Sequence, residues 1–245
     1  MSERIAIISD IHANLTALEA VLGYLRDEGI TRIFNLGDLV GKGPRPALVV
    51  DRCREVCEVV VQGNWDDLVV TDPDPVAGWN RDALGGERLA YLAGLPGSFD
   101  FLLSGRHVRL FHASQVSPHH RVQVDASAEE HRSMFESTDF TGWDAAPDLV
   151  GYGDVHEAFQ RIYGGRVLFN AGSVGNSLDI PLASLAILSG RVGDPNPAPW
   201  ALQFVRVPYD IEAEIAIAAL SGMPELDAYA RELRTARYRR LDRSE

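Results

Sequence analysis

Short apolar runs alternate with amphipathic helical segments over the first 62 residues, and this alternation constrains the fold more than any other feature. The runs at 4–9, 32–36 and 58–62 are rich in β-branched residues, as buried strands are. Between them, residues 15–28 carry leucines at helical spacing, and residues 46–55 form a second helical pattern. Strands joined through helices in this way form a parallel sheet with right-handed crossovers. The pattern therefore predicts an α/β fold.

The remainder of the chain has an antiparallel character. A loop rich in Asp and Pro is expected at 71–76, a helix at 82–95, and helical structure again from about residue 211. No internal repeat or linker marks a boundary, so we expect a single domain over residues 1–245 with a C-terminal helical extension. The expected architecture is a two-layer mixed β-sheet sandwich flanked by helices. Six further strands are expected, four of them in two hairpins: 99–103 with 107–111, 159–163 with 166–169, then 183–188 and 201–207.

Composition excludes several classes of protein. The 245 residues include 35 acidic and 23 basic side chains, and 46% are hydrophobic, as in a globular protein rather than a disordered one. No apolar run approaches the roughly 20 residues of a membrane helix, and the start lacks a signal peptide, so we expect a cytoplasmic protein without a membrane partner. Cys53 and Cys57 are too few for a disulfide framework. The net charge of −12 argues against a nucleic-acid partner.

Polar side chains follow the carboxyl ends of the predicted strands, where functional groups gather in open α/β folds. Several of them stand beside a glycine, which allows the sharp turn that such a position needs. Each segment alone is weak evidence, because an aspartate after a strand is more often a helix cap than a ligand. Together, carboxylate, amide and imidazole groups form a ligand set for Mn²⁺, Fe²⁺ or Zn²⁺. The segments are Ser9-Asp10-Ile-His12, Gly37-Asp38, Gly63-Asn64-Trp65-Asp66, Phe111-His112-Ala-Ser114, Gly153-Asp154-Val-His156 and Asn170-Ala-Gly172-Ser173.

In order and spacing, these segments resemble the calcineurin-like metallophosphoesterases, and in particular their compact prokaryotic phosphodiesterase-like branch. The resemblance extends from about residue 4 to 190, and the segment 170–175 looks like the turn that follows the last ligand in that branch. It implies a metal-dependent phosphoesterase, with a phosphodiesterase as the favoured interpretation. The implied substrate is a small phosphate ester or a nucleotide. The segments are Asp10-x-His12, Gly37-Asp38, Gly63-Asn64, His112 and Gly153-Asp154-x-His156.

The resemblance also implies two divalent cations, with Mn²⁺ favoured over Fe, Zn or Ni. A hydroxide bound to the two cations would attack the phosphate ester. Asp38, Asn64 and His112 are the residues that the resemblance assigns to the catalytic machinery, and the segment from Trp79 to Leu95 is expected to shape the substrate cleft. The expected ligands are Asp10, His12, Asp38 and His156 for the first cation, and Asp38, Asn64, His112 and Asp154 for the second.

The sequence departs from the family pattern at two positions. Asp154 stands where the family has a histidine, which predicts either an altered second metal site or a weakened, empty one. Trp65 stands where the family has the histidine thought to protonate the leaving oxygen. An indole cannot act as that acid, so we expect better activity on aryl or activated diesters than on simple monoesters.

Several nearby groups have two interpretations each. His119 and His120 either replace the missing acid or are solvated loop histidines, and Arg121 either binds phosphate or is a surface arginine. Asp66 and Asp67 either orient the site or cap a helix, the latter being favoured.

Two alternatives to a phosphodiesterase remain open at this point. The same fold can serve as a non-catalytic protein-interaction module, or as a nuclease or protein phosphatase. The segment 231–243, with six arginines and two acids, is either a solvated helix or a contact for an acidic partner or nucleic acid. The sequence leaves the oligomeric state open.

Overall fold

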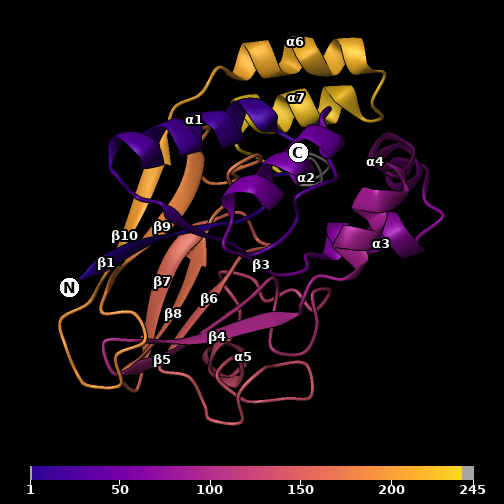
Figure 1. Cartoon of the computed structure of the whole chain (residues 1–245). Coiled ribbons are helices and arrows are strands. Elements are labelled where there is room, and N and C mark those ends of the chain that lie inside the picture. The colour runs from indigo at the N-terminus through magenta and orange to yellow at the C-terminus, as the bar shows by residue number, and fades with distance from the viewer. Residues whose placement is uncertain (1, 239–245) are drawn as a thin grey trace.

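Ten strands form two five-stranded sheets in the computed structural model, which describes residues 2–238 (Figure 1). The strand order is β10-β9-β1-β2-β3 in the first sheet and β4-β5-β6-β8-β7 in the second. The first sheet consists of β1 (Glu3–Ile8), β2 (Arg32–Asn35), β3 (Val59–Val60), β9 (Ala183–Gly190) and β10 (Ala201–Val207). The second consists of β4 (Ser98–Leu103), β5 (Arg106–Phe111), β6 (Leu149–Tyr152), β7 (Ala158–Tyr163) and β8 (Arg166–Ala171).

The first sheet begins as the sequence predicts. Strands β1, β2 and β3 are parallel neighbours, joined through α1 (Leu15–Asp27) and α2 (Pro46–Val56). Asn14 caps α1, since its side chain accepts a hydrogen bond from the Ala17 amide at 3.0 Å. Strands β9 and β10 extend the sheet antiparallel to β1, so the sheet is mixed.

The second sheet contains both expected hairpins, β4–β5 and β7–β8. Strand β6 lies between the hairpins and runs parallel to both β5 and β8. Both sheets are therefore mixed, and the predicted two-layer mixed β-sheet sandwich is confirmed.

Alternation along β1 shows how the sheets pack. Ile5 and Ile7 point into an apolar core shared with the second sheet, while Ala6 and Ile8 point into a core shared with the helices. Successive side chains of a strand face opposite sides, so a strand buried on both faces is a continuous apolar run. In the core between the sheets, the Phe34 ring meets the edges of two rings from β4.

The helices after β3 differ from the expectation. A helix α3 (Asn64–Thr71) begins directly at Asn64, and α4 (Pro75–Ala93) begins well before residue 82. The loop expected at 71–76 therefore ends earlier than predicted. Asp74 accepts a hydrogen bond from the Val76 amide at 2.8 Å and caps α4, which begins at Pro75. Gly85, with φ of 72°, interrupts α4. A short helix, α5 (Ala128–Ser133), was not expected.

The C-terminal segment is helical from residue 211, as expected, and forms α6 (Ile211–Ser221) and α7 (Leu226–Thr235). These helices lie beside α1, at the end of the molecule away from α5 (Figure 1). The buried Glu214 of α6 accepts hydrogen bonds from Thr16 at 2.6 Å and from Arg45. Residues 239–243 of the basic run lie outside the described residues. No helix of residues 2–238 is long and apolar enough to cross a membrane.

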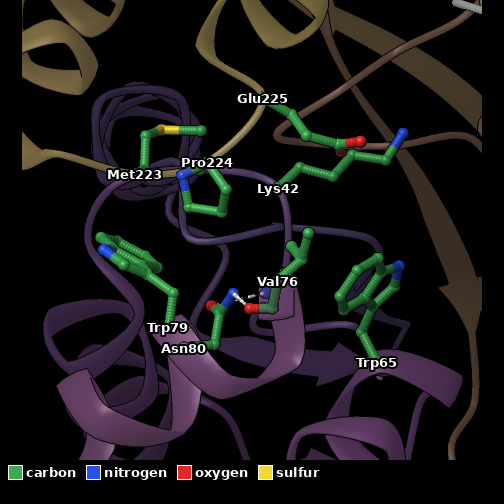
Figure 2. Close-up of a pocket in the computed structure, with 10 residues that line it drawn as sticks. Lys42, Trp65, Val76, Trp79, Asn80, Met223, Pro224 and Glu225 are labelled. Carbon is green, nitrogen blue, oxygen red and sulfur yellow. Dashed lines mark hydrogen bonds between the residues drawn. The ribbon is translucent and has the colours of Figure 1, made fainter. Parts of the chain in front are cut away.

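A small pocket lies where the α6–α7 loop approaches α3 and α4 (Figure 2). Trp65 and Trp79 stand on opposite sides of it, and Met223 and Pro224 close it from the C-terminal side. The pocket has mainly apolar walls, with Lys42 and Glu225 among its polar lining residues.

Candidate metal centre

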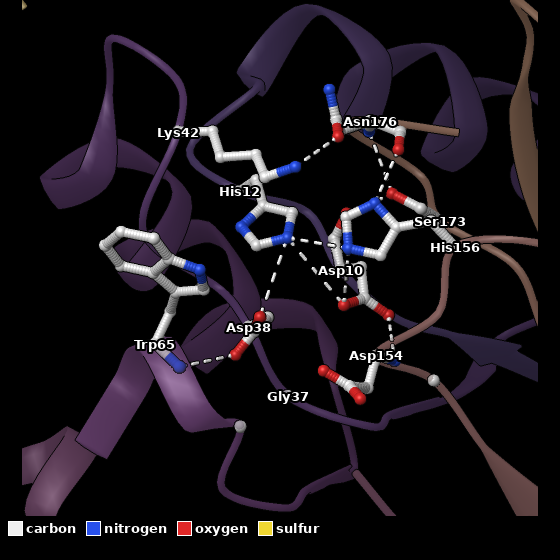
Figure 3. Close-up of polar contacts among 12 residues, drawn as sticks. Asp10, His12, Gly37, Asp38, Lys42, Trp65, Asp154, His156, Ser173 and Asn176 are labelled. Atoms are coloured by element: carbon white, nitrogen blue, oxygen red, sulfur yellow. Dashed lines mark hydrogen bonds and ion pairs between the residues drawn. The ribbon is translucent and has the colours of Figure 1, made fainter. Parts of the chain in front are cut away.

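Seven buried or half-buried side chains meet between the carboxyl ends of strands from both sheets. Figure 3 shows Asp10, His12, Asp38, Asp154 and His156 among them. Segments following β1, β2 and β3 supply four of them, and segments following β5 and β6 supply the other three. The structure thus brings together all the site residues predicted from the sequence: Asp10, His12, Asp38, Asn64, His112, Asp154 and His156.

Five of these residues have a left-handed backbone conformation, which costs free energy in any residue other than glycine. Hydrogen bonds between the loops hold this conformation, since the Asp10 amide donates to the Gly37 carbonyl and the His12 amide to the Asp38 carbonyl, both at 2.9 Å. Strained backbone of this kind concentrates at functional sites. The φ angles are 53° for Asp10, 48° for His12, 54° for Asp38, 65° for Asp154 and 63° for His156.

Asp10, His12 and His156 form a first cluster, in which a carboxylate oxygen and two ring nitrogens face one another. The Nδ1 atoms of the two rings lie 3.0 Å from the Val40 carbonyl and 2.6 Å from the Asn176 carbonyl. A carbonyl only accepts, so Nδ1 carries the proton and Nε2 is left with a lone pair in each ring. The two Nε2 atoms are 3.1 Å apart. The buried Asp10 Oδ1, 3.2 Å from His156 Nε2, accepts no hydrogen bond from any described residue. This arrangement fits a cation among the three groups.

A second cluster contains Asp10, Asp38 and His112. His112 Nδ1 donates to the Leu36 carbonyl at 2.8 Å, which again directs Nε2 inward. This Nε2 atom lies 3.2 Å from Asn64 Oδ1 and 3.4 Å from Asp38 Oδ1. The other oxygen of Asp38, Oδ2, lies 3.5 Å from His12 Nε2. Asp38 therefore directs one carboxylate oxygen toward each cluster.

The electrostatics of the two clusters favour a positive charge. Burial raises the pKa of Asp38 well above its usual range, and the charge of Asp10 adds to this effect. Burial lowers the pKa of His112, but the nearby carboxylates, chiefly Asp38 and Asp10, outweigh it and raise that pKa to about 9. Burial and the neighbouring His156 lower the pKa of His12. Without a cation, the carboxylates draw a proton into the site.

Asp66 fixes the loop that carries Asp38. Its buried carboxylate accepts hydrogen bonds from the amides of Asp38 and Leu39 at 2.9 Å and of Gly63 at 3.0 Å. It therefore both caps α3 and orients the site, so that its two predicted roles coexist. The backbones approach so closely that a Cβ on Gly63 would lie 2.1 Å from the Asp38 amide nitrogen.

The loop after β5 places its charged residues differently. Arg121 donates two hydrogen bonds to Asp154, from Nε at 2.8 Å and from Nη2 at 2.7 Å. Asp154 Oδ1 lies 3.8 Å from His112 Nε2, at the edge of the second cluster. His119 pairs with Asp67 at the surface at 2.8 Å, and His120 is exposed. The solvated-loop interpretation therefore describes both histidines.

Sequence reasoning missed Lys42 and Asn176. Lys42 Nζ donates to Asn176 Oδ1 at 2.7 Å and to the buried Glu232 of α7 at 3.1 Å. The backbone carbonyl of Asn176 accepts a hydrogen bond from His156 Nδ1. These contacts therefore connect the C-terminal helix pair α6–α7 to the first cluster. The partners of Lys42 are separated from it by 134 and 190 residues, and no local spacing signals such contacts.

The pocket between α3, α4 and the α6–α7 loop lies beside the first cluster. The centroids of the Trp65 and His12 rings are 6.5 Å apart, in an edge-on arrangement. A Cβ on Gly41, at the pocket wall, would lie 2.9 Å from Trp65 and 3.0 Å from His12. Trp79 also lines the pocket, at the start of the segment that the sequence assigns to the cleft.

Comparisons with known proteins agree with this geometry. Residues 4–191 match the model of the calcineurin-like phosphoesterase superfamily domain, so the chain belongs to that family, as its sequence motifs indicate. An uncharacterised protein of Methanocaldococcus jannaschii is 29% identical over 248 residues, covering 90% of this chain and 94% of that protein.

Two solved structures have a similar fold. The crystal structure of a metallophosphoesterase from Sphaerobacter thermophilus matches with a TM-score of 0.75 and 28% identity, over 96% of this chain and 99% of that one. A hypothetical protein from Pyrococcus horikoshii has the same fold, with a TM-score of 0.73 and 18% identity, over 96% and 98% of the two chains. The match to the family ends at residue 191, so the C-terminal helix pair α6–α7 lies outside it.

Proposed function

We propose that this protein hydrolyses phosphodiesters at a centre of two divalent cations. Family membership indicates phosphoesterase activity, and the diester preference and the paired cations are the specific content of the proposal. The observation that carries it is the position of Asp38, with Oδ2 at 3.5 Å from His12 Nε2 and Oδ1 at 3.4 Å from His112 Nε2. A carboxylate with one oxygen toward each of two donor clusters suits a bridging ligand in a two-metal site.

The donor chemistry supports borderline divalent cations. Imidazole, carboxylate and amide groups suit Mn²⁺, Fe²⁺, Zn²⁺ and Ni²⁺, and the share of oxygen donors favours Mn²⁺ among them. No cysteine lies among the donors. In this proposal the first cation is held by Asp10, His12, His156 and Asp38, and the second by Asp38, Asn64 and His112.

Bound cations would lower the pKa of a water molecule and offset the charge on the phosphoryl oxygens. The chain itself holds the donors in place, because the carbonyls of Leu36, Val40 and Asn176 keep the Nε2 lone pairs directed inward. In hydrolysis, the water oxygen forms a bond to phosphorus and loses its proton to solvent. The bond from phosphorus to the leaving oxygen breaks, and the leaving group takes the electron pair.

The leaving group meets no strong acid at Trp65. The indole stands beside His12 and cannot supply a proton as an imidazolium does, so a leaving group that is stable as an anion is favoured. The half-buried Trp65 ring, beside His12, offers an aromatic surface against which an aryl leaving group can pack close to the centre. The proposed substrates are therefore aryl or otherwise activated phosphodiesters, small molecules or nucleotides.

Hydrolysis of bis(p-nitrophenyl) phosphate with and without added Mn²⁺ tests this proposal. The wild-type protein should turn over in a Mn²⁺-dependent manner, and Asp38→Asn should lose at least about 100-fold of that activity, since it loses a bridging charge. Asp27→Asn is the matched control, because Asp27 is 72% exposed on α1. Full activity in Asp38→Asn would overturn the proposal. A wild-type protein that retains no metal and turns over no ester would instead support the non-catalytic interaction module.

A further inference from the structure

Arg121 is joined to Asp154 by a two-point ion pair at the edge of the second cluster. Its Nε and Nη2 atoms donate to the two carboxylate oxygens at 2.8 and 2.7 Å. The side chain of Asp154 is 3% exposed, whereas that of Arg121 is 44% exposed. The guanidinium therefore extends from a buried anchor at the edge of the second cluster toward solvent.

Both partners of this pair are fixed by the fold. The Asp154 amide donates to Asp10 Oδ2 at 3.0 Å, which places Asp154 beside the first cluster as well (Figure 3). Val122, the residue after Arg121, is buried, and its carbonyl accepts a hydrogen bond from the Tyr152 hydroxyl at 3.0 Å. Arg121 thus projects from an anchored point of its loop, and little conformational freedom remains to be lost on binding.

The pair has a distinct electrostatic consequence. Asp154 alone would add a negative charge where the family has a neutral imidazole, but the guanidinium cancels that charge. A cation bound to Asp154 Oδ1 would stand close to the guanidinium, and the two like charges would repel each other. Asp154 is therefore better suited to hold Arg121 than to bind the second cation.

The remaining donors of Arg121 can serve a substrate. A guanidinium has five N–H groups, and Asp154 takes two of them. Within residues 2–238, Arg121 donates from Nε and Nη2 and not from Nη1, and its side chain is partly open to solvent. Arginine binds phosphoryl oxygens with two parallel hydrogen bonds when its planar group is held in place.

We propose that Arg121, anchored by Asp154, is a phosphoryl-oxygen binding residue of this site, and that Asp154 is its positioning residue rather than a ligand of the second cation. This inference rests on the proposed function, because it needs a phosphoester at the adjacent centre. It replaces the assignment of Asp154 as a metal ligand. The ligand class is the phosphoryl anion, whether in a diester or as free phosphate.

Calorimetric titration of inorganic phosphate into the Mn²⁺-loaded protein, together with metal content by mass spectrometry, tests the inference. Arg121→Ala should weaken phosphate binding by roughly 10-fold to 100-fold, the usual effect of losing charge-assisted hydrogen bonds. Its KM for the diester should rise more than its kcat falls. Arg121→Lys, which keeps the charge but loses the planar fork, should bind phosphate with an intermediate affinity. Arg26→Ala is the control, since Arg26 is 78% exposed on α1.

Asp154→Asn separates the two roles of the carboxylate. The inference predicts the wild-type number of metal ions per chain in this variant, together with weakened phosphate binding. The inference is overturned if Asp154→Asn loses metal, or if Arg121→Ala, folded and metal-loaded, binds phosphate as tightly as the wild type. Failure of the proposed function looks different, because the wild-type protein itself would then load no metal or hydrolyse no diester.

Discussion

The Nε2 atoms of His12 and His156 lie 3.1 Å apart, and each has a lone pair because the Nδ1 proton of its own ring goes to a backbone carbonyl. Two facing acceptors repel each other unless a cation or a proton lies between them. Both residues have a left-handed backbone, with φ of 48° and 63°. The fold therefore holds a strained, electrostatically incomplete arrangement that a cation would complete.

Metal-dependent stabilisation should depend on His12. We expect Mn²⁺ to raise the Tm of the wild-type protein and to have little effect on His12→Ala, because a ligand that binds the native state stabilises it by an amount that grows with the logarithm of its affinity. Thermal unfolding with and without Mn²⁺ measures this difference. His131→Ala is the control: that buried ring bonds to Tyr163 and to the Gln123 carbonyl, away from the clusters. It should lower the Tm and keep the metal-dependent rise, and a full rise in His12→Ala would contradict the assignment.

Gly63 should tolerate no side chain. A Cβ there would lie 2.1 Å from the Asp38 amide nitrogen and 2.2 Å from Asp38 Oδ1, so Gly63→Ala must displace the loop that carries Asp38. We expect a loss of roughly 3 kcal/mol or more in unfolding free energy, together with weaker metal retention. Urea unfolding gives the first quantity. Gly78→Ala on α4, where a Cβ meets nothing within 4 Å, should be neutral or stabilising by about 0.5–1 kcal/mol. Equal effects of the two substitutions would refute this account.

Asp66 should matter far more than its neighbour Asp67. Asp66→Ala leaves three buried amides of the site loops without their acceptor, and we expect a cost of about 2–5 kcal/mol in unfolding free energy. Asp67→Ala loses a surface pair with His119, which contributes about 0–1 kcal/mol. Chemical denaturation of both variants makes the comparison. A cost for Asp67→Ala as large as that for Asp66→Ala would show that the loops are held in some other way.

Trp65→His should change the preference for the leaving group. An imidazole at this position supplies an acid, which typically contributes about 10²–10⁴-fold for a poor leaving group. We expect kcat/KM to rise for alkyl esters and simple monoesters more than for nitrophenyl diesters. Trp79→His is the matched control, because it alters the same pocket at a different wall. An equal change on all substrates would count against a missing acid at residue 65.

The hydrophobic pattern of the sequence predicts strand β1 and the two β-hairpins of this fold. The run that forms β1 is apolar throughout because both of its faces are buried, and the two hairpins have short polar turns between apolar runs. The start of α4 was missed because the Asp and Pro residues of 71–76 indicate a loop, although Asp74 and Pro75 also suit a helix N-terminus.

The site was predictable to the extent that its residues follow strands. All seven residues of the centre were expected together, because the carboxyl ends of neighbouring strands meet. Their partners were not predictable, since Arg121 reaches Asp154 across 33 residues and Lys42 reaches Asn176 across 134. Such pairs depend on how loops fold over the site, and no period in the sequence encodes them. The two-point contact with Arg121 therefore came only from the structure.

Asp38 is proposed to join two cation sites, and the electron paramagnetic resonance spectrum of the Mn²⁺-saturated protein reports whether it does. Two Mn²⁺ ions that share the Asp38 carboxylate should give an exchange-coupled spectrum, with two ions per chain by mass spectrometry. Asp38→Asn should lose that coupling, whereas Asp27→Asn should keep it. A wild-type protein that binds one ion per chain, or two ions without coupling, would show that Asp38 does not bridge two cations.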